Sequence, residues 1–226
     1  MAHVFVESNW LFAFAAPAHH QVAAAAELLD RARLGELTMH LPNICIGEAR
    51  QAILTKCQPR KEANAIRRFL SWSEPAGHIT PGDAAVARVI LDKYENNVKN
   101  ALDDLDKTFR RLADLPYLHI FGLDDDMLQL ATKLALDGVA VKPYDHAVLA
   151  GVLVGATRLW DAGEQAISFC EVDADLQPWD RYGNIKLPLQ AAYDAAHVWV
   201  FGDFMLAEPP RPADLAVIPD LGPQAP

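Results

Sequence analysis

Short runs of β-forming residues alternate with longer helix-forming segments along the chain, and this alternation is the feature that most constrains its fold. The runs 3–6, 37–41 and 166–170 are rich in residues that favour strands, and helix-forming sequence separates them. Such an order favours parallel pairing, because the chain must cross back over the sheet before each new strand begins. We therefore predict an α/β fold with a central, mainly parallel sheet.

Turn residues and apolar periodicity predict the remaining elements. The residues after the first run read as a loop at Glu7, Ser8 and Asn9, which leads into a helix over 18–34. From 81 to 113, apolar residues recur at steps of three and four, which predicts one long amphipathic helix or a helix pair. We also expect a helix from 43 onward, helices over 61–72, 124–138, 145–156 and 190–195, and short strands over 139–141 and 197–201.

The composition limits the classes of partner. The chain has 226 residues, of which 51% are hydrophobic and 22% are charged, as is typical of a globular protein. Its formal net charge is −10, with 20 Lys and Arg against 30 Asp and Glu. This balance argues against a general binder of polyanions, so any surface for nucleic acid must be local.

Cysteine content and hydropathy indicate the compartment. Cys45, Cys57 and Cys170 are an odd number without a CxxC pair, which favours a reducing environment over a disulfide framework. The apolar stretch 10–18 is about half the length of a membrane span and has no Lys or Arg before it. We expect a cytoplasmic protein with no membrane partner.

Four acidic residues fall near strand or helix ends. Glu7 follows the first expected strand, Glu48 lies on the helix after the second, Asp145 opens a later helix, and Asp173 follows a later strand. The carboxyl ends of parallel strands form the ligand crevice of such a sheet, so these side chains are expected to share one crevice. Carboxylates are the ligands of Mg²⁺ or Mn²⁺, which activate water and neutralise charge on a phosphodiester.

Four sequence motifs around these acids resemble those of the PIN-domain nucleases. The first is a strand that ends in an acid, one spacer and Asn, and the second is an acid on the helix after the next strand. The third is an Asp that opens a helix of small residues, and the fourth is a strand that runs into Asp-x-Asp and an apolar residue. In this chain they are VFVESN at 4–9, PNICIGE at 42–48, KPYDHAVLA at 142–150 and ISFCEVDADL at 167–176, in the order of the family.

The resemblance implies a Rossmann-like three-layer sandwich and a metal-dependent nuclease, in particular an endoribonuclease that uses Mg²⁺ or Mn²⁺ to activate water. Glu7, Glu48, Asp145 and Asp173 would be catalytic metal ligands, with Asp175 as a further candidate. Asn9 and Ser8 would orient the first carboxylate.

The same resemblance divides the chain. Residues 1–206 would form the PIN-like domain, with a helical insertion at about 57–115. Residues 207–226 form a Pro-rich tail, which we expect to be extended or disordered.

The chain departs from the family pattern in two ways. Glu7 stands where the family has Asp, and the insertion and tail make the chain longer than the compact toxins of the family. The alternative interpretation is therefore a catalytically weakened PIN-like module that binds a protein partner. Whether an inhibitor protein exists stays open, and we favour a homodimer because it is the commonest symmetric oligomer.

A third interpretation takes Asp173 and Asp175 as the nucleophile pair of a haloacid-dehalogenase-type phosphatase. That fold places its Asp-x-Asp after the first strand with Gly-Thr following, whereas here it comes late and Leu-Gln follows. The context disfavours this interpretation.

A basic stretch is the candidate nucleic-acid surface. Phe69, Trp72 and Tyr94 could stack on single-stranded bases beside it. The competing interpretation is that the charges form a solvated helix face and the aromatic rings belong to the core. The candidate phosphate-binding residues are Arg50, Lys56, Arg60, Lys61, Arg67 and Arg68.

Overall fold

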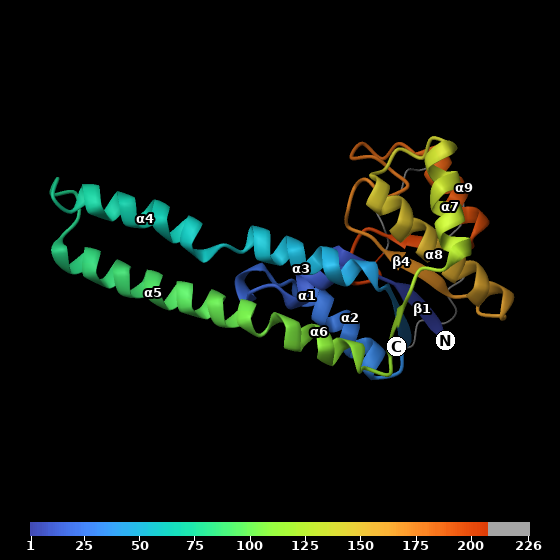
Figure 1. Ribbon diagram of the computed structural model, residues 1–226, viewed down its shortest axis with the longest axis horizontal. Helices are drawn as coiled ribbons and strands as arrows, with labels where there is room; N and C mark the ends of the chain where they lie inside the picture. Colours follow the sequence, from blue (N-terminus) through green and yellow to red (C-terminus); the bar gives the residue numbers. More distant parts are fainter. Residues whose placement is uncertain (208–226) are drawn as a thin grey trace.

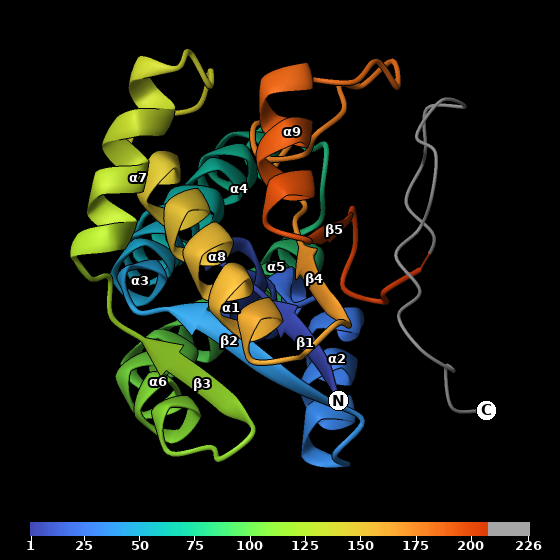
Figure 2. The same ribbon diagram turned by 90° about the vertical axis from the view of Figure 1, so that its right-hand side faces the viewer.

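A five-stranded parallel sheet organises the chain in the computed structural model, which describes residues 1–207. The strand order is β3-β2-β1-β4-β5, and helices cover both faces (Figure 2). This confirms the predicted α/β sandwich with a parallel sheet. The strands are β1 (Ala2–Phe5), β2 (Leu37–Pro42), β3 (Leu118–Phe121), β4 (Ile167–Cys170) and β5 (Trp199–Phe201).

The central strand β1 is buried on both faces. Val4 pairs in register with Met39 of β2 and with Ser168 of β4. Val4 points into one hydrophobic core together with Met39, whereas Phe5 points into the other together with Phe169. Burial of both faces explains why apolar residues occupy successive positions of β1, as Val4 and Phe5 do.

The first face of the sheet is covered by the helices that follow β1 and β2. Trp10 is fully buried there, and its indole Nε1 donates a hydrogen bond of 3.0 Å to the carbonyl oxygen of Ala25. This bond satisfies the polar atom of the ring while the rest of it fills the core. The helices are α1 (Ser8–Ala15), α2 (Ala23–Arg33), α3 (Ile44–Lys56) and α6 (Leu105–Ala113), with a 3-10 turn η1 (Ala18–His20).

The second face is covered by α7 (Asp125–Leu136), α8 (Pro143–Asp161) and α9 (Leu187–Ala195). A Cβ atom on Gly155 of α8 would lie 3.0 Å from Cε1 of Phe5, closer than ordinary van der Waals contact. Glycine at this position therefore lets the helix lie close against β1.

A helical hairpin projects away from the sheet. Figure 1 shows α4 (Pro59–Ser73) and α5 (Pro81–Asp103) side by side along their length. Leu70 and Leu91 form a small core between them, and Arg67 of α4 pairs with Asp92 and Glu95 of α5. Of the expected insertion at 57–115, α4 and α5 form the projection, whereas α6 packs against the main core.

Two local predictions were wrong. Residues 139–141 form no strand, because Gly138 turns the chain at φ +80° and the backbone N–H of Val141 bonds back to the carbonyl oxygen of Val139 in a tight turn. The third strand of the sheet is β3, which the pattern did not reveal. The expected loop after β1 is helix α1, because the Glu7 side chain caps it by accepting from the backbone N–H of Asn9.

The other expected helices and strands are present with shifted ends. The 81–113 segment is the helix pair α5 and α6, divided at Asp104. In the described residues no helix has the length and apolar content needed to cross a membrane. The expected extended or disordered tail at 207–226 lies outside the described residues except for its first residue.

Candidate acidic site at the carboxyl ends of the strands

Glu7 is held rigidly between β1 and α1. Its Oε1 accepts a hydrogen bond of 2.8 Å from the backbone N–H of Asn9, and its Oε2 accepts one of 2.6 Å from the Ser8 hydroxyl. The side chain is only 4% exposed. Ser8 and Asn9 both hydrogen-bond this carboxylate, Asn9 through its backbone N–H and also through its side chain.

Burial changes the acidity of Glu7. Removal from water raises the pKa of its carboxyl group from 4.5 to about 7, and the negative charge of Glu48 adds to the rise. The hydrogen bonds from Ser8 and Asn9 oppose it, since they stabilise the ionised form. Glu48 lies on α3 and is half-buried. Near neutral pH, Glu7 is thus poised between its protonated and ionised forms.

Asp145 lies in the first turn of α8 and is half-buried. Its Oδ2 is buried with no hydrogen-bond partner in the described part of the chain. Burial raises the pKa of Asp145, the charge of Asp173 raises it further, and Lys142 partly offsets both. An ionised oxygen without a partner is costly in such a place, which makes Asp145 a natural ligand for a cation.

Glu171 belongs to the same cluster, and the sequence analysis missed it. It follows β4 directly and is fully buried. Its Oε1 accepts a hydrogen bond of 2.5 Å from the backbone N–H of Asp173, while its Oε2 is buried and unpartnered among the described residues. Burial raises the pKa of Glu171 well above its ordinary value, and the charge of Glu7 raises it further.

A signal for Glu171 was present in the sequence. It is the acid nearest the end of its strand, just as Glu7 follows β1 closely. Because an Asp-x-Asp pattern begins two residues later, the sequence analysis assigned the metal ligands in this segment to Asp173 and Asp175 instead. Asp173 is half-buried and acts electrostatically on Asp145 and Glu171, whereas Asp175 is exposed and forms an ion pair of 3.1 Å with Lys142. Asp175 therefore lies at the rim of the cluster.

Tyr144 places a hydroxyl group against these acids. Its oxygen is buried without a described hydrogen-bond partner. Burial raises the pKa of Tyr144, and negative charge on Cys45, Glu48 and Glu7 would raise it further. The hydroxyl therefore stays protonated and is available as a donor.

The donor chemistry fits a hard divalent cation. Every acid of the cluster offers carboxylate oxygen, the ligand that Mg²⁺ and Mn²⁺ prefer, and Asp145 Oδ2 and Glu171 Oε2 lack other partners in the part of the chain that the structure describes. In residues 1–207, however, no three His, Cys, Asp or Glu side chains converge closely enough to form a metal site as they stand. The acidic side chains lie in one region and all offer carboxylate oxygens, but they are not close enough together to form a metal site as they stand.

The basic residues that were predicted to bind phosphate lie outside the acidic cluster, and their surroundings differ. Arg50 forms an ion pair of 2.8 Å with Asp106, and Arg67 pairs with Asp92 and Glu95, so acids compensate both charges. Lys56 lies over the ring of Phe12, 5.1 Å from its centroid.

The outer face of α4 carries the other basic side chains. Lys61 and Arg68 line a shallow surface groove of about 820 Å³ together with Trp72. A second groove of about 850 Å³, between α3 and α4 on one side and α5 and α6 on the other, is lined in part by Arg60. The hairpin therefore offers local basic surface next to an exposed aromatic ring.

Comparison with protein-family models, curated proteins and solved structures found no match for the chain.

Proposed function

We propose that the chain is a metal-dependent nuclease, an endoribonuclease that hydrolyses phosphodiester bonds in RNA at the acidic cluster. One observation carries the proposal: among residues 1–207, Asp145 Oδ2 and Glu171 Oε2 are buried without partners beside further carboxylates. Such a cluster is unfavourable when ionised unless a cation compensates its charge. The choice of RNA rests on the resemblance of the four motifs to the PIN-domain nucleases.

Glu7, Glu48, Asp145 and Asp173 would hold Mg²⁺ or Mn²⁺, and Glu171 joins them in this proposal. A bound divalent cation would supply charge neutralisation at the phosphodiester and a lower pKa for water. Ser8 and the backbone of Asn9 keep Glu7 in place through the bonds to its two oxygens.

The chain's own groups would also position the substrate. Lys61 and Arg68 would contact phosphates along α4, and Trp72, whose side chain is 61% exposed, would stack on a base. A cytoplasmic location belongs to the same proposal and is supported by the odd number of cysteines, all of them buried, and by the absence of a CxxC pair from the sequence.

The test is cleavage of single-stranded RNA, structured RNA and single-stranded DNA in the presence of Mg²⁺ or Mn²⁺. Wild-type protein is compared with Asp145→Asn and with Asp161→Asn, a matched variant at the exposed far end of the same helix. We expect RNA cleavage by wild type and Asp161→Asn only. Equal cleavage by Asp145→Asn would place the activity elsewhere, and DNA cleavage alone would overturn the choice of RNA.

The hairpin favours a second candidate function, that of a protein-interaction module. Phe69 on α4 and Ile90 on α5 are 54% and 60% exposed. Arg67 of α4 and Asp92 of α5 form an ion pair. Phe69 lies two residues from Arg67, and Ile90 lies two residues from Asp92. Two residues correspond to about 200° of helix rotation, so Phe69 and Ile90 lie on the side of the hairpin away from this ion pair. Exposed apolar side chains on both helices suit an interface, and the expected homodimer supplies a second copy as its occupant.

Light scattering tests this candidate. Wild-type protein should be a dimer and a Phe69→Glu, Ile90→Glu double variant a monomer with unchanged circular dichroism. A monomeric wild type, or a dimer that survives both substitutions, would remove this candidate and leave the nuclease proposal untouched.

A further inference from the structure

A second cavity lies between the sheet and the helices α7 and α8, and its lining shares no residue with the acidic cluster. Its volume is about 410 Å³, within the usual range of small-molecule sites. Rings from three adjacent strands line it: Phe5 from β1, His40 from β2, and His119 and Phe121 from β3. Gly155 of α8, which packs directly against the Phe5 ring, also lines the cavity.

The rings provide flat surfaces for a planar ligand. Phe5 stacks on His40 with a centroid separation of 4.9 Å, and His119 meets His40 edge-on at 5.5 Å. Phe121 meets Phe5 edge-on at 6.1 Å. Such walls favour an aromatic guest, because rings pack well in stacked and edge-to-face arrangements.

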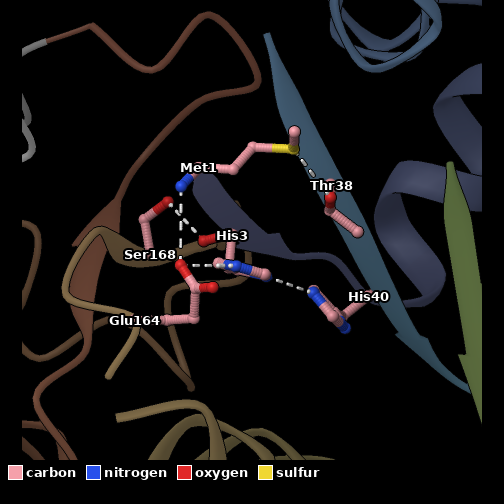
Figure 3. Close-up of polar contacts among 6 residues, drawn as sticks. All are labelled: Met1, His3, Thr38, His40, Glu164 and Ser168. Carbon is pink, nitrogen blue, oxygen red and sulfur yellow. Dashed lines mark hydrogen bonds and ion pairs between the residues drawn. The ribbon is translucent and has the colours of Figure 1, made fainter. Parts of the chain in front are cut away.

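A chain of side chains leads from the protein surface to His40 (Figure 3). The Oε2 of Glu164 lies 3.2 Å from the Nε2 of His3, and the Nδ1 of His3 lies 2.9 Å from the Nε2 of His40. His3 and His40 are 9% and 7% exposed. Glu164 is itself held by the amino group of Met1 at 3.4 Å.

This chain determines which nitrogen of His40 carries the proton. Burial lowers the pKa of His40 to about 3, and positive charge on His3 or His119 would lower it further, so His40 is neutral and has one donor and one acceptor nitrogen. When His3 is neutral, the carboxylate of Glu164 favours its single proton on Nε2, which leaves the Nδ1 of His3 as acceptor. His40 then donates from Nε2 and keeps a lone pair on Nδ1.

The Nδ1 of His40 is the remaining polar atom of this chain. It lies on the side of the ring away from His3, and no donor among the described residues bonds to it. Arg158, at the rim of the cavity, is occupied by ion pairs of 2.5 Å with Asp124 and 2.7 Å with Asp126. The cavity therefore offers aromatic walls and an acceptor, with the charges at its rim compensated.

We propose that this cavity is a binding site for a planar, uncharged heteroaromatic ring whose ring N–H donates a hydrogen bond to the Nδ1 of His40. The site is separate from the acidic cluster and does not depend on the proposed nuclease function.

Two probe molecules test the hydrogen bond. Benzimidazole carries a ring N–H, whereas 1-methylbenzimidazole has the same ring system without that donor. Titrations at pH 8 into full-length protein labelled with ¹⁵N-histidine should show benzimidazole shifting the His40 nitrogen signals, with about tenfold weaker binding of the methylated probe. Equal affinity of both probes, or no binding of either, would overturn the proposal.

Substitution at the rim tests the location. Gly122→Leu places a side chain at the cavity, and its Cβ would meet only Asn43 Nδ2, at 3.7 Å. Gly82→Leu is the matched control at the start of α5, where the Cβ would meet Thr80 Oγ1, also at 3.7 Å. Benzimidazole binding should be lost in the first variant and kept in the second. Unchanged binding in both variants would show that benzimidazole binds at another site and would overturn the proposed location.

Glu164→Gln tests the positioning of the proton without altering the cavity wall. The wild-type ¹⁵N spectrum should show the His40 proton on Nε2, and the variant should show a mixture of the two tautomers. Benzimidazole should then bind more weakly to the variant, while the weaker binding of 1-methylbenzimidazole stays the same. A wild-type proton on Nδ1 of His40 would contradict the proposed direction of the hydrogen bond.

Discussion

Glu7 and Glu171 place two buried carboxyl groups just beyond the ends of the neighbouring strands β1 and β4, and the negative charge of Glu7 raises the pKa of Glu171. Two like charges at such a site are stable only when protons, hydrogen bonds or a cation compensate them. Glu7 has hydrogen bonds to both oxygens, whereas one oxygen of Glu171 has none in the described structure. The stability of the fold should therefore respond to pH and to divalent cations.

The first prediction concerns pH and Glu7→Gln. The folded-state pKa of Glu7 is raised to about 7, so its contribution to the free energy of unfolding is greatest below 4.5 and is lost as the pH rises toward 7. The rise from 4.5 to about 7 corresponds to about 3 kcal/mol. In denaturant titrations Glu7→Gln should match wild type at pH 4 and exceed its stability at pH 8 by up to that amount. Parallel pH curves for the two proteins would contradict this.

The second prediction concerns metal and Glu171→Gln. If cations bind the ionised acids of the folded state, Mn²⁺ at about 100 times its dissociation constant should stabilise wild type by about 2.7 kcal/mol, or about 5–10 °C in Tm. Thermal unfolding followed by circular dichroism at pH 8 should show this rise in wild type and in Asp161→Asn but not in Glu171→Gln. An equal rise in all three would show that Mn²⁺ binds outside the cluster.

The third prediction concerns the outer face of α4. Lys61→Ala and Arg68→Ala should each weaken RNA binding and lower the slope of log affinity against log salt by about 0.7, the value for one phosphate contact to a single strand. Arg33→Ala on α2, an exposed basic residue far from this groove in the sequence, is the control. Filter-binding titrations at several salt concentrations measure the slopes, and equal slopes in all proteins would exclude this face as the binding surface.

The fourth prediction concerns two helical glycines. Gly155→Ala should destabilise the protein by about 1–3 kcal/mol, because the new Cβ would lie 3.0 Å from Phe5, whose ring is fixed by stacking on His40. Gly47→Ala in α3 meets no atom within 4 Å and should stabilise it by about 0.5–1 kcal/mol, since alanine favours a helix. Denaturant midpoints of the two variants measure these changes. Stabilisation by Gly155→Ala would mean that α8 does not press on β1.

Strands were predicted correctly where residues close together in the sequence indicate them. The runs that became β1, β2 and β4 are short and rich in residues that favour strands, and turn or cap residues follow β1 and β2. Asp145 could be placed at a helix start for the same reason, since first turns are local features. Glu7 could be placed only at the end of a strand, because the helix that it caps was predicted as a loop. The run that became β3 is equally short, and only its pairing with β2 defines it as a strand.

The sequence by itself determined that the chain is an α/β protein with acids at the carboxyl ends of its strands, because strand, helix and cap preferences act over a few neighbouring residues. Only the tertiary structure decided that Glu171 lies buried beside Glu7, that α4 and α5 form a projecting hairpin, and that His3 and His40 form a chain to a second cavity. Each of these depends on contacts between residues distant in sequence, through which burial and nearby charge change the chemistry of a side chain.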